Sequence, residues 1–240
     1  MLLPLIRPPR LYHVGAFDGH RPRGASFEGD ALSASPCPAA WRGIARLGDA
    51  PVWRLDKTAP RMIDAHALTP LDLTTLDLWG IATGRVRRVP VWRVWDTDEN
   101  DVARYMEFPE RDAAREEAHD RLAGLDIDPD ADGALEAVMT AHDGLVATTG
   151  FAARSGHRDH TELLRDLLLI DLADALGLDG VYWADLLDPA NLSAPRAAIP
   201  AGRVPAFRAY RLAGDPDDSD ALTPAPTRLD TVRLDPLIAA

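Results

Sequence analysis

Several residue types are scarce in this 240-residue chain, and each scarcity excludes a class of protein. Cys37 is the only cysteine, so an intrachain disulfide and a cysteine-based zinc site are excluded. No apolar run approaches the roughly 18 residues that a membrane-spanning helix needs. Residues 1–9 are too short a segment, and too rich in proline, for a signal peptide. We therefore expect the protein in the cytoplasm. Export by a signal-free route would leave no trace in the sequence.

Basic side chains are also in the minority. The chain has 26 lysines and arginines against 38 acidic residues, which gives a formal net charge of −12. A surface with this charge repels the phosphate backbone of nucleic acids. Lys57 is the sole lysine, and glutamate contributes only eight of the 38 acidic residues. This skew is typical of a GC-rich bacterial genome, and it leaves few positions for any mechanism that needs a glutamate.

What the chain does contain is typical of a folded globular protein. Hydrophobic residues make up 46% of it and charged residues 27%. A chain of this length can bury a full core without metal or disulfide crosslinks. We expect a single domain over 1–213, followed over 214–240 by an Asp/Pro-rich tail with too little apolar surface to order on its own.

The spacing of apolar residues predicts strands interleaved with helices. Residues 91–95 alternate in a β-branched and aromatic run, as a strand does. The most apolar helix is expected to begin at a cap, Asp159 or Thr161, and to stop at Gly177. We expect strands at 11–14, 31–35, 51–55, 89–95, 105–108, 181–183 and 207–212, and helices at 38–47, 71–81, 111–122, 134–141 and 161–176. This order of elements predicts an α+β fold.

Two segments imitate metal sites, and neither completes one. Residues 128–136 follow the first half of a calcium-binding loop, but Met139 stands where the loop needs a bidentate glutamate. His157 and His160 lie three residues apart at an expected helix start, but a third ligand is needed from elsewhere, and neither a cysteine nor a second close histidine pair is available for it. The interpretation is a solvated acidic turn and a polar helix start, and no metal site is predicted.

The N-terminal part carries a more informative order of short patterns. The order begins with a strand, Leu11-Tyr12-His13-Val14, which is followed by Gly15 and a loop. After the loop come the segment Leu32-Ser33-Ala34-Ser35, a helix containing Trp41 and a strand at 52–55. This order resembles the first half of ADP-ribosyltransferase-like domains of the histidine-first type. His13 matches the family's strand histidine, Ser33 and Ser35 its small hydroxyl residues, and Gly15 its turn glycine displaced by one position.

The C-terminal part adds to the resemblance. The segment Gly177-Leu178-Asp179-Gly180-Val181-Tyr182-Trp183 is similar to the strand that follows the last long helix of such domains. The family then places a glutamate on a final strand, which falls here around 193–200, and that segment contains no glutamate. The resemblance covers 11–55 and 161–212 and leaves the middle of the chain unmatched.

The resemblance implies both a fold and a function. The fold is an ADP-ribosyltransferase-like split, mixed or antiparallel β-sheet with flanking helices. NAD is bound as a substrate between two groups of strands, and ADP-ribose is transferred to a macromolecule, a protein in preference to a nucleic acid. The family includes bacterial toxins and defence effectors, for which a neutralising protein partner is expected, and no membrane partner is expected.

The resemblance also assigns residues to these roles. A histidine and a carboxylate hold the nicotinamide ribose and stabilise the positive centre that forms as nicotinamide leaves. Arginines pair with the pyrophosphate, and aromatic rings stack on the bases. The resemblance implies His13 as a catalytic residue, and Asp185 and then Glu28 are the first candidates for the carboxylate that the final strand lacks. The implied cofactor-binding residues are Tyr12, Gly15, Arg21, Arg23, Phe27, Ser33 and Ser35.

Other interpretations stay open. The missing glutamate favours a degenerate member that binds a nucleotide or a protein without catalysis, and a third hypothesis is a protein whose acidic tail docks on a partner. Glu107 and Asp188 are further candidates for the missing carboxylate, and Trp183 is a further candidate for stacking on a base. The alternative role for His13 is structural: a histidine on a half-buried strand whose ring nitrogens are hydrogen-bonded within the fold.

Overall fold

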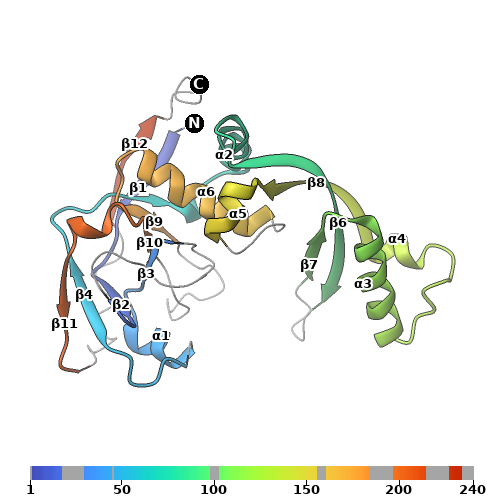
Figure 1. Ribbon diagram of the computed structural model, residues 1–240, viewed down its shortest axis with the longest axis horizontal. Coiled ribbons are helices and arrows are strands. Elements are labelled where there is room, and N and C mark those ends of the chain that lie inside the picture. Colours follow the sequence, from blue (N-terminus) through green and yellow to red (C-terminus); the bar gives the residue numbers. More distant parts are fainter. Residues whose placement is uncertain are drawn as a thin grey trace.

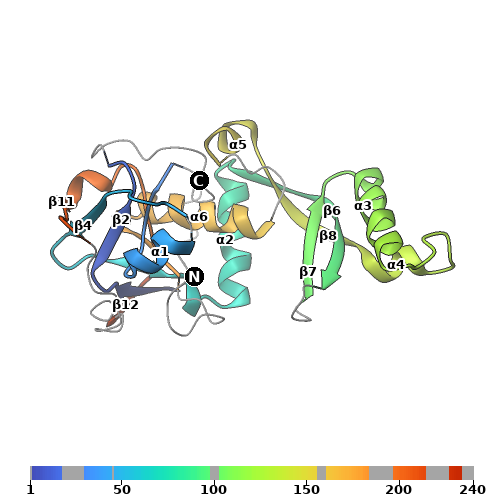
Figure 2. The ribbon, with the colours of Figure 1, turned by 90° about the horizontal axis from the view of Figure 1, so that it is seen from below.

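The computed structural model describes residues 2–17, 30–44, 46–97, 103–155, 161–183, 197–214 and 227–233. Within these ranges the strands form three sheets. Two sheets and their helices make a body, at the left of Figure 1, and the third sheet belongs to an arm that projects from the body. The same division is visible from below (Figure 2). The protein is a mixed α+β fold, as the order of elements predicts.

The larger body sheet has its strands in the order β12-β1-β5-β9-β10-β3. All neighbours pair antiparallel except β5 and β9, which run parallel. The bounds are Thr227–Arg233 for β12, Leu2–Arg7 for β1, Met62–Asp64 for β5, Gly180–Tyr182 for β9, Ala197–Ile199 for β10 and Leu32–Ala34 for β3. We call it the first sheet.

The second sheet is an antiparallel set of three strands at one side of the body. Its order is β11-β4-β2, with β11 at Arg208–Arg211, β4 at Val52–Asp56 and β2 at Leu11–Val14. A single bridge between Tyr12 and Ser35 joins its edge strand β2 to the end of β3. The two sheets therefore meet at the point where the His13 strand passes the serine-containing strand.

Two long helices, α2 (Pro70–Ala82) and α6 (Thr161–Ala175), pack against each other beside the first sheet. Helix α2 begins with a capping box, in which the Thr69 hydroxyl accepts from the Asp72 backbone and the Asp72 carboxylate accepts from the Thr69 N–H. Helix α6 carries the largest share of the core: Leu164, Leu168 and Leu172 are fully buried. Two shorter helices, α1 (Pro38–Ile44) and α5 (Thr149–Ser155), complete the body.

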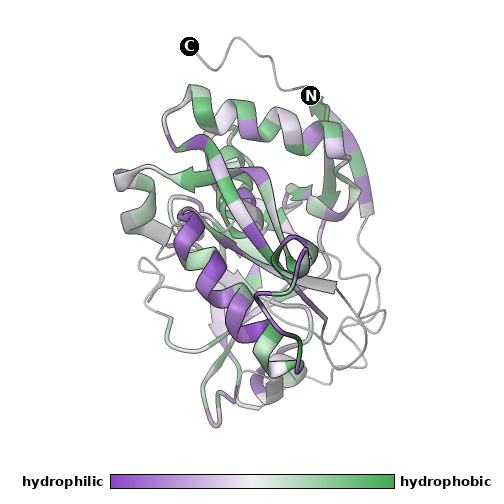
Figure 3. Ribbon diagram, turned by 90° about the vertical axis from the view of Figure 1, so that its right-hand side faces the viewer, coloured by the Kyte–Doolittle hydropathy of each residue, from purple (hydrophilic) through white to green (hydrophobic). Residues whose placement is uncertain are grey.

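The arm has its own small core. Its sheet order is β7-β6-β8, with β7 at Ala103–Phe108, β6 at Val86–Thr97 and β8 at Met139–Ala147. Helices α3 (Arg111–Gly124) and α4 (Ala134–Val138) cover one face of it, where Ala114 and Ala118 pack on Val94. The outward side of α3 is hydrophilic (Figure 3). The first residues of β6 and the last of β8 belong to the body core instead, through Val86 and Leu145.

Most of the expected elements are confirmed, but the helix expected at 134–141 is wrong beyond Val138. From Met139 onward the chain is strand β8, which pairs antiparallel with β6 from Val94 back to Val86. Nine backbone pairs to a neighbouring strand outweigh the local helical spacing. The sequence contains the spacing but does not show the partner strand.

Residues 214–240 are not a uniformly loose tail. Strand β12 pairs along β1, and Leu229 and Val232 pack against the main core. Strand β1 was itself not among the expected strands, because Pro4 interrupts its pattern. The structure accommodates Pro4 at an irregularity in the β1–β12 register, where a proline without an N–H is tolerated. Residues 215–226 and 234–240 lie outside the described residues.

Candidate functional site

The candidate site is built around His13, at the junction of the two body sheets. Nδ1 of His13 lies 2.9 Å from the carbonyl oxygen of Ser33, and Nε2 lies 3.4 Å from that of Ala16. Burial lowers the pKa of His13 below its ordinary value of 6.5, so the ring is neutral at pH 7. A neutral imidazole has one N–H, and the shorter contact assigns it to Nδ1, which donates to Ser33.

This tautomer determines what the other nitrogen can do. Nε2 then carries a lone pair, and the Ala16 carbonyl beside it cannot donate a hydrogen bond. Among the described residues, Nε2 has no hydrogen-bond donor as a partner. In this tautomer Nε2 can accept a hydrogen bond but cannot donate one.

Aromatic side chains surround the His13 ring. Trp41 meets it edge-on with ring centroids 5.9 Å apart, and Phe17 lies 6.1 Å away. Phe17 in turn contacts Trp53 at 5.4 Å. We call His13, Phe17, Trp41 and Trp53 the His13 cluster. Its composition provides flat apolar surface beside one polar nitrogen, which suits a planar heterocycle.

Gly15 shapes the turn that follows His13. Its φ is +135°, and a Cβ at this position would lie 3.3 Å from Nε2 of His13. Its carbonyl oxygen accepts a hydrogen bond of 3.0 Å from the Trp53 indole. Only glycine combines this backbone conformation with open space beside the acceptor nitrogen.

The structure brings some of the other predicted residues to this junction, but the contacts that they make there hold the fold together. Ser33 contributes its backbone carbonyl to His13. Tyr12 is buried in an apolar cluster with Trp41, and the Ser35 hydroxyl is fully buried, accepting from the Cys37 backbone N–H at 3.1 Å. The remaining implied residues, Arg21, Arg23, Phe27, Glu28 and Asp185, lie outside the described residues, as does Asp188.

Strand β10 stands where the resemblance places the family's glutamate. It pairs with β3, with Ala198 opposite Ser33. Its described residues are Ala197, Ala198 and Ile199, all fully buried. The described part of this strand therefore offers no carboxylate.

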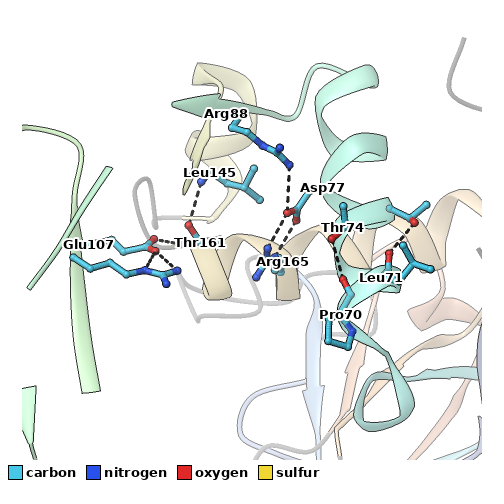
Figure 4. A network of polar contacts seen from close by, with 11 residues as sticks. Pro70, Leu71, Thr74, Asp77, Arg88, Glu107, Leu145, Thr161 and Arg165 are labelled. Atoms are coloured by element: carbon cyan, nitrogen blue, oxygen red, sulfur yellow. Dashed lines mark hydrogen bonds and ion pairs between the residues drawn. The ribbon is translucent and has the colours of Figure 1, made fainter. Parts of the chain in front are cut away.

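Glu107 belongs to β7. This strand lies in the arm, away from β2, in both Figure 1 and Figure 2. Its side chain is buried and accepts hydrogen bonds from Arg93 Nε at 2.9 Å and from the Thr161 backbone N–H at 2.7 Å (Figure 4). Burial alone would raise the pKa of Glu107, but the hydrogen bonds from Thr161 and the charge of Arg93 lower it below its ordinary value. Glu107 is thus an ionised contact between the arm and the start of α6.

The Asp-Gly pair of the C-terminal motif has structural roles. One Asp179 oxygen pairs with Lys57, and the other accepts from the Arg61 N–H at 2.8 Å. Gly180 has φ +152°, and a Cβ there would lie 2.2 Å from the Ala198 carbonyl oxygen. The packing of β5, β9 and β10 thus requires these residues. Trp183 donates its indole N–H to Asp166 at 3.1 Å, which fixes its ring against the core.

Asp77 of α2 is another buried carboxylate, held by Arg165 through two hydrogen bonds of 2.8 and 2.9 Å (Figure 4). It joins α2 to α6 and also lies 3.9 Å from Arg88. Within the described ranges no three His, Cys, Asp or Glu side chains gather as a metal ion would need. The described helices include none with the length and apolarity to cross a membrane.

By its fold and site the chain is a mixed α+β protein whose two body sheets join at a neutral, aromatic-walled histidine. Comparisons with known protein families, with curated proteins and with solved structures found no match to it. Its function therefore has to be inferred from the residues themselves.

Proposed function

We propose that the chain binds NAD at the His13 cluster and transfers ADP-ribose to a macromolecular target. The observation that carries the proposal is the neutral His13, held through Nδ1 by the Ser33 carbonyl with Nε2 left as an acceptor. A ribose hydroxyl is a donor that suits this nitrogen. The position of His13 between two strand groups agrees with the site that the resemblance implies.

The surroundings supply the rest of a nucleotide site. Phe17, Trp41 and Trp53 offer ring faces and edges for nicotinamide. Loss of nicotinamide leaves a positive charge on the ribose, which a carboxylate stabilises in the transition state. We propose that Glu28 or Asp185 supplies that carboxylate. The proposed contacts to the pyrophosphate come from Arg21 and Arg23.

A second candidate function is nucleotide or protein binding without catalysis. It is favoured by β10, whose described residues Ala197–Ile199 lack a carboxylate. In that case the His13 cluster would recognise a ligand without breaking a bond.

Incubation of the protein with labelled NAD and cell lysate separates the two candidates. We expect the wild type to label a target and His13→Ala to lose about tenfold or more in NAD affinity, the scale of one unsatisfied buried polar group. Either Glu28→Gln or Asp185→Asn should abolish labelling while NAD still binds.

His66→Ala is the matched control, because His66 is an exposed histidine on a 3₁₀ turn of the body. NAD binding with no labelled target in any lysate favours the second candidate. If millimolar NAD neither binds nor raises the melting temperature of the folded wild type, NAD recognition at the His13 cluster is refuted.

A further inference from the structure

A hollow of about 620 Å³ lies at the other end of the second sheet from His13. It is bounded by the β1–β2 connection, the β4–β5 turn and the start of β11. Its lining includes Leu11, the first residue of β2, and Asp56, the last of β4. His13 instead pairs with Trp53, so the hollow and the His13 cluster are separate places.

Five charged side chains line this hollow, and two of them are already neutralised. Asp56 is held by Arg54, with hydrogen bonds of 2.8 to 3.1 Å. Lys57 pairs with the buried carboxylate of Asp179 and lies 5.5 Å from the Phe207 ring centroid. These pairs leave the charge of the remaining three side chains uncompensated.

Those three are arginines: Arg7, Arg10 and Arg208. Each is exposed, and none has an ion-pair or hydrogen-bond partner within the described part of the chain. Like charges around one concavity repel each other, and the walls of a concavity concentrate their field. In a chain of net charge −12, this is a local positive site.

The backbone around the hollow is constrained before any ligand arrives. Pro8, Pro9 and Pro60 line it with fixed φ angles, and Ala59 holds a φ of +50° in the β4–β5 turn. A site with a rigid backbone loses less entropy when it binds a ligand. The volume also lies in the range of small-molecule sites, which is about 300–1,000 Å³.

We propose that this hollow, which we call the arginine hollow, binds a small molecule carrying two or more linked phosphate groups. A guanidinium matches two phosphate oxygens at once, and three guanidinium groups match the charge of a diphosphate. A small ligand is favoured over nucleic acid because the rest of the acidic surface repels a long phosphate backbone.

Titration calorimetry of the full chain with inorganic pyrophosphate tests the arginine hollow. Pyrophosphate binding should weaken by about tenfold in each of three single variants, Arg7→Gln, Arg10→Gln and Arg208→Gln. Arg87→Gln is the matched control, since Arg87 is an exposed arginine near the start of β6 and does not line the hollow. Inorganic monophosphate should bind the wild type at least about tenfold more weakly than pyrophosphate.

Three outcomes would overturn the proposal. They are no pyrophosphate binding at millimolar concentration, an equal loss of affinity in Arg87→Gln, and tighter binding of a single-stranded oligonucleotide that displaces pyrophosphate. Equal affinity for monophosphate and pyrophosphate would overturn the requirement for linked phosphates. His13→Ala should leave pyrophosphate binding unchanged, so the outcome is independent of NAD binding at the His13 cluster.

Discussion

Replacing Glu107 with glutamine removes a negative charge at the contact between arm and body. The carboxylate accepts from Arg93 on one oxygen and from the Thr161 N–H on the other. A glutamine has one oxygen and one NH₂, so one of these two donors must lose its acceptor. The side chain of Glu107 is fully buried and that of Arg93 only 17% exposed, so water compensates for little of the loss.

The size of the effect follows from this burial. Removing one partner of a buried ion pair costs about 3–5 kcal/mol. Arg93 keeps some solvent and a contact with the Tyr105 ring at 4.3 Å, so we expect a loss somewhat smaller than that range, about 2–4 kcal/mol. Urea unfolding at pH 7 measures it, with Glu116→Gln on the exposed side of α3 as the control, which should change stability by less than about 0.5 kcal/mol.

The pH dependence provides a second readout. The folded state lowers the pKa of Glu107, so its carboxylate stabilises the fold above the unfolded pKa of about 4.3. That contribution is lost as the pH falls through the folded value. The difference between wild type and Glu107→Gln should be constant above about pH 5 and should shrink on further acidification. A difference under about 0.5 kcal/mol at pH 7, or one that grows towards low pH, would refute the proposed contact.

Three further predictions concern the body. The His13 ring should titrate below pH 6.5 by NMR, and because its pKa is lower in the folded state, its contribution to stability is full above about pH 6.5 and declines as the pH falls. Gly180→Ala should lower the free energy of unfolding by more than about 3 kcal/mol in urea, since the added Cβ meets a backbone oxygen that cannot move aside. Ending the chain at residue 226 should cost about 2–4 kcal/mol by the same assay, from loss of the Leu229 and Val232 contacts with the core, while ending it at residue 233 should cost much less.

The elements that the sequence predicts well are those whose signals are local. Helix α2 has Pro70 in its first turn and leucines up to Ile81, and α6 has a dense leucine pattern that ends before Gly177. By contrast, β8 and β12 are strands because β6 and β1 lie beside them. A pattern of single residues does not contain the identity of a distant partner, so these strands could not be assigned from spacing.

The candidate site divides in the same way. The strand of His13 and the proximity of Ser33 follow from the order of motifs, whereas the use of the Ser33 carbonyl rather than its hydroxyl depends on the register at the sheet junction. The arginine hollow left no sequence signal at all. Arg10 directly precedes β2, and Arg208 begins β11 almost 200 positions later in the chain. Only the pairing of β2 and β11 on either side of β4 brings them together.

The chain leaves the body and returns to it at one place. The Thr148 backbone N–H donates to the Arg85 carbonyl at 2.8 Å, and its hydroxyl donates to the Gly84 carbonyl at 2.9 Å. A little further out, Val89 still pairs directly with Gly144, a spacing that a two-residue hairpin turn spans. Everything beyond that pair is an excursion that the body does not need for its own connectivity. The arm is therefore one insertion in the connectivity of the body, and a tight turn in its place would close the chain at the cost of the Glu107 contact with the start of α6.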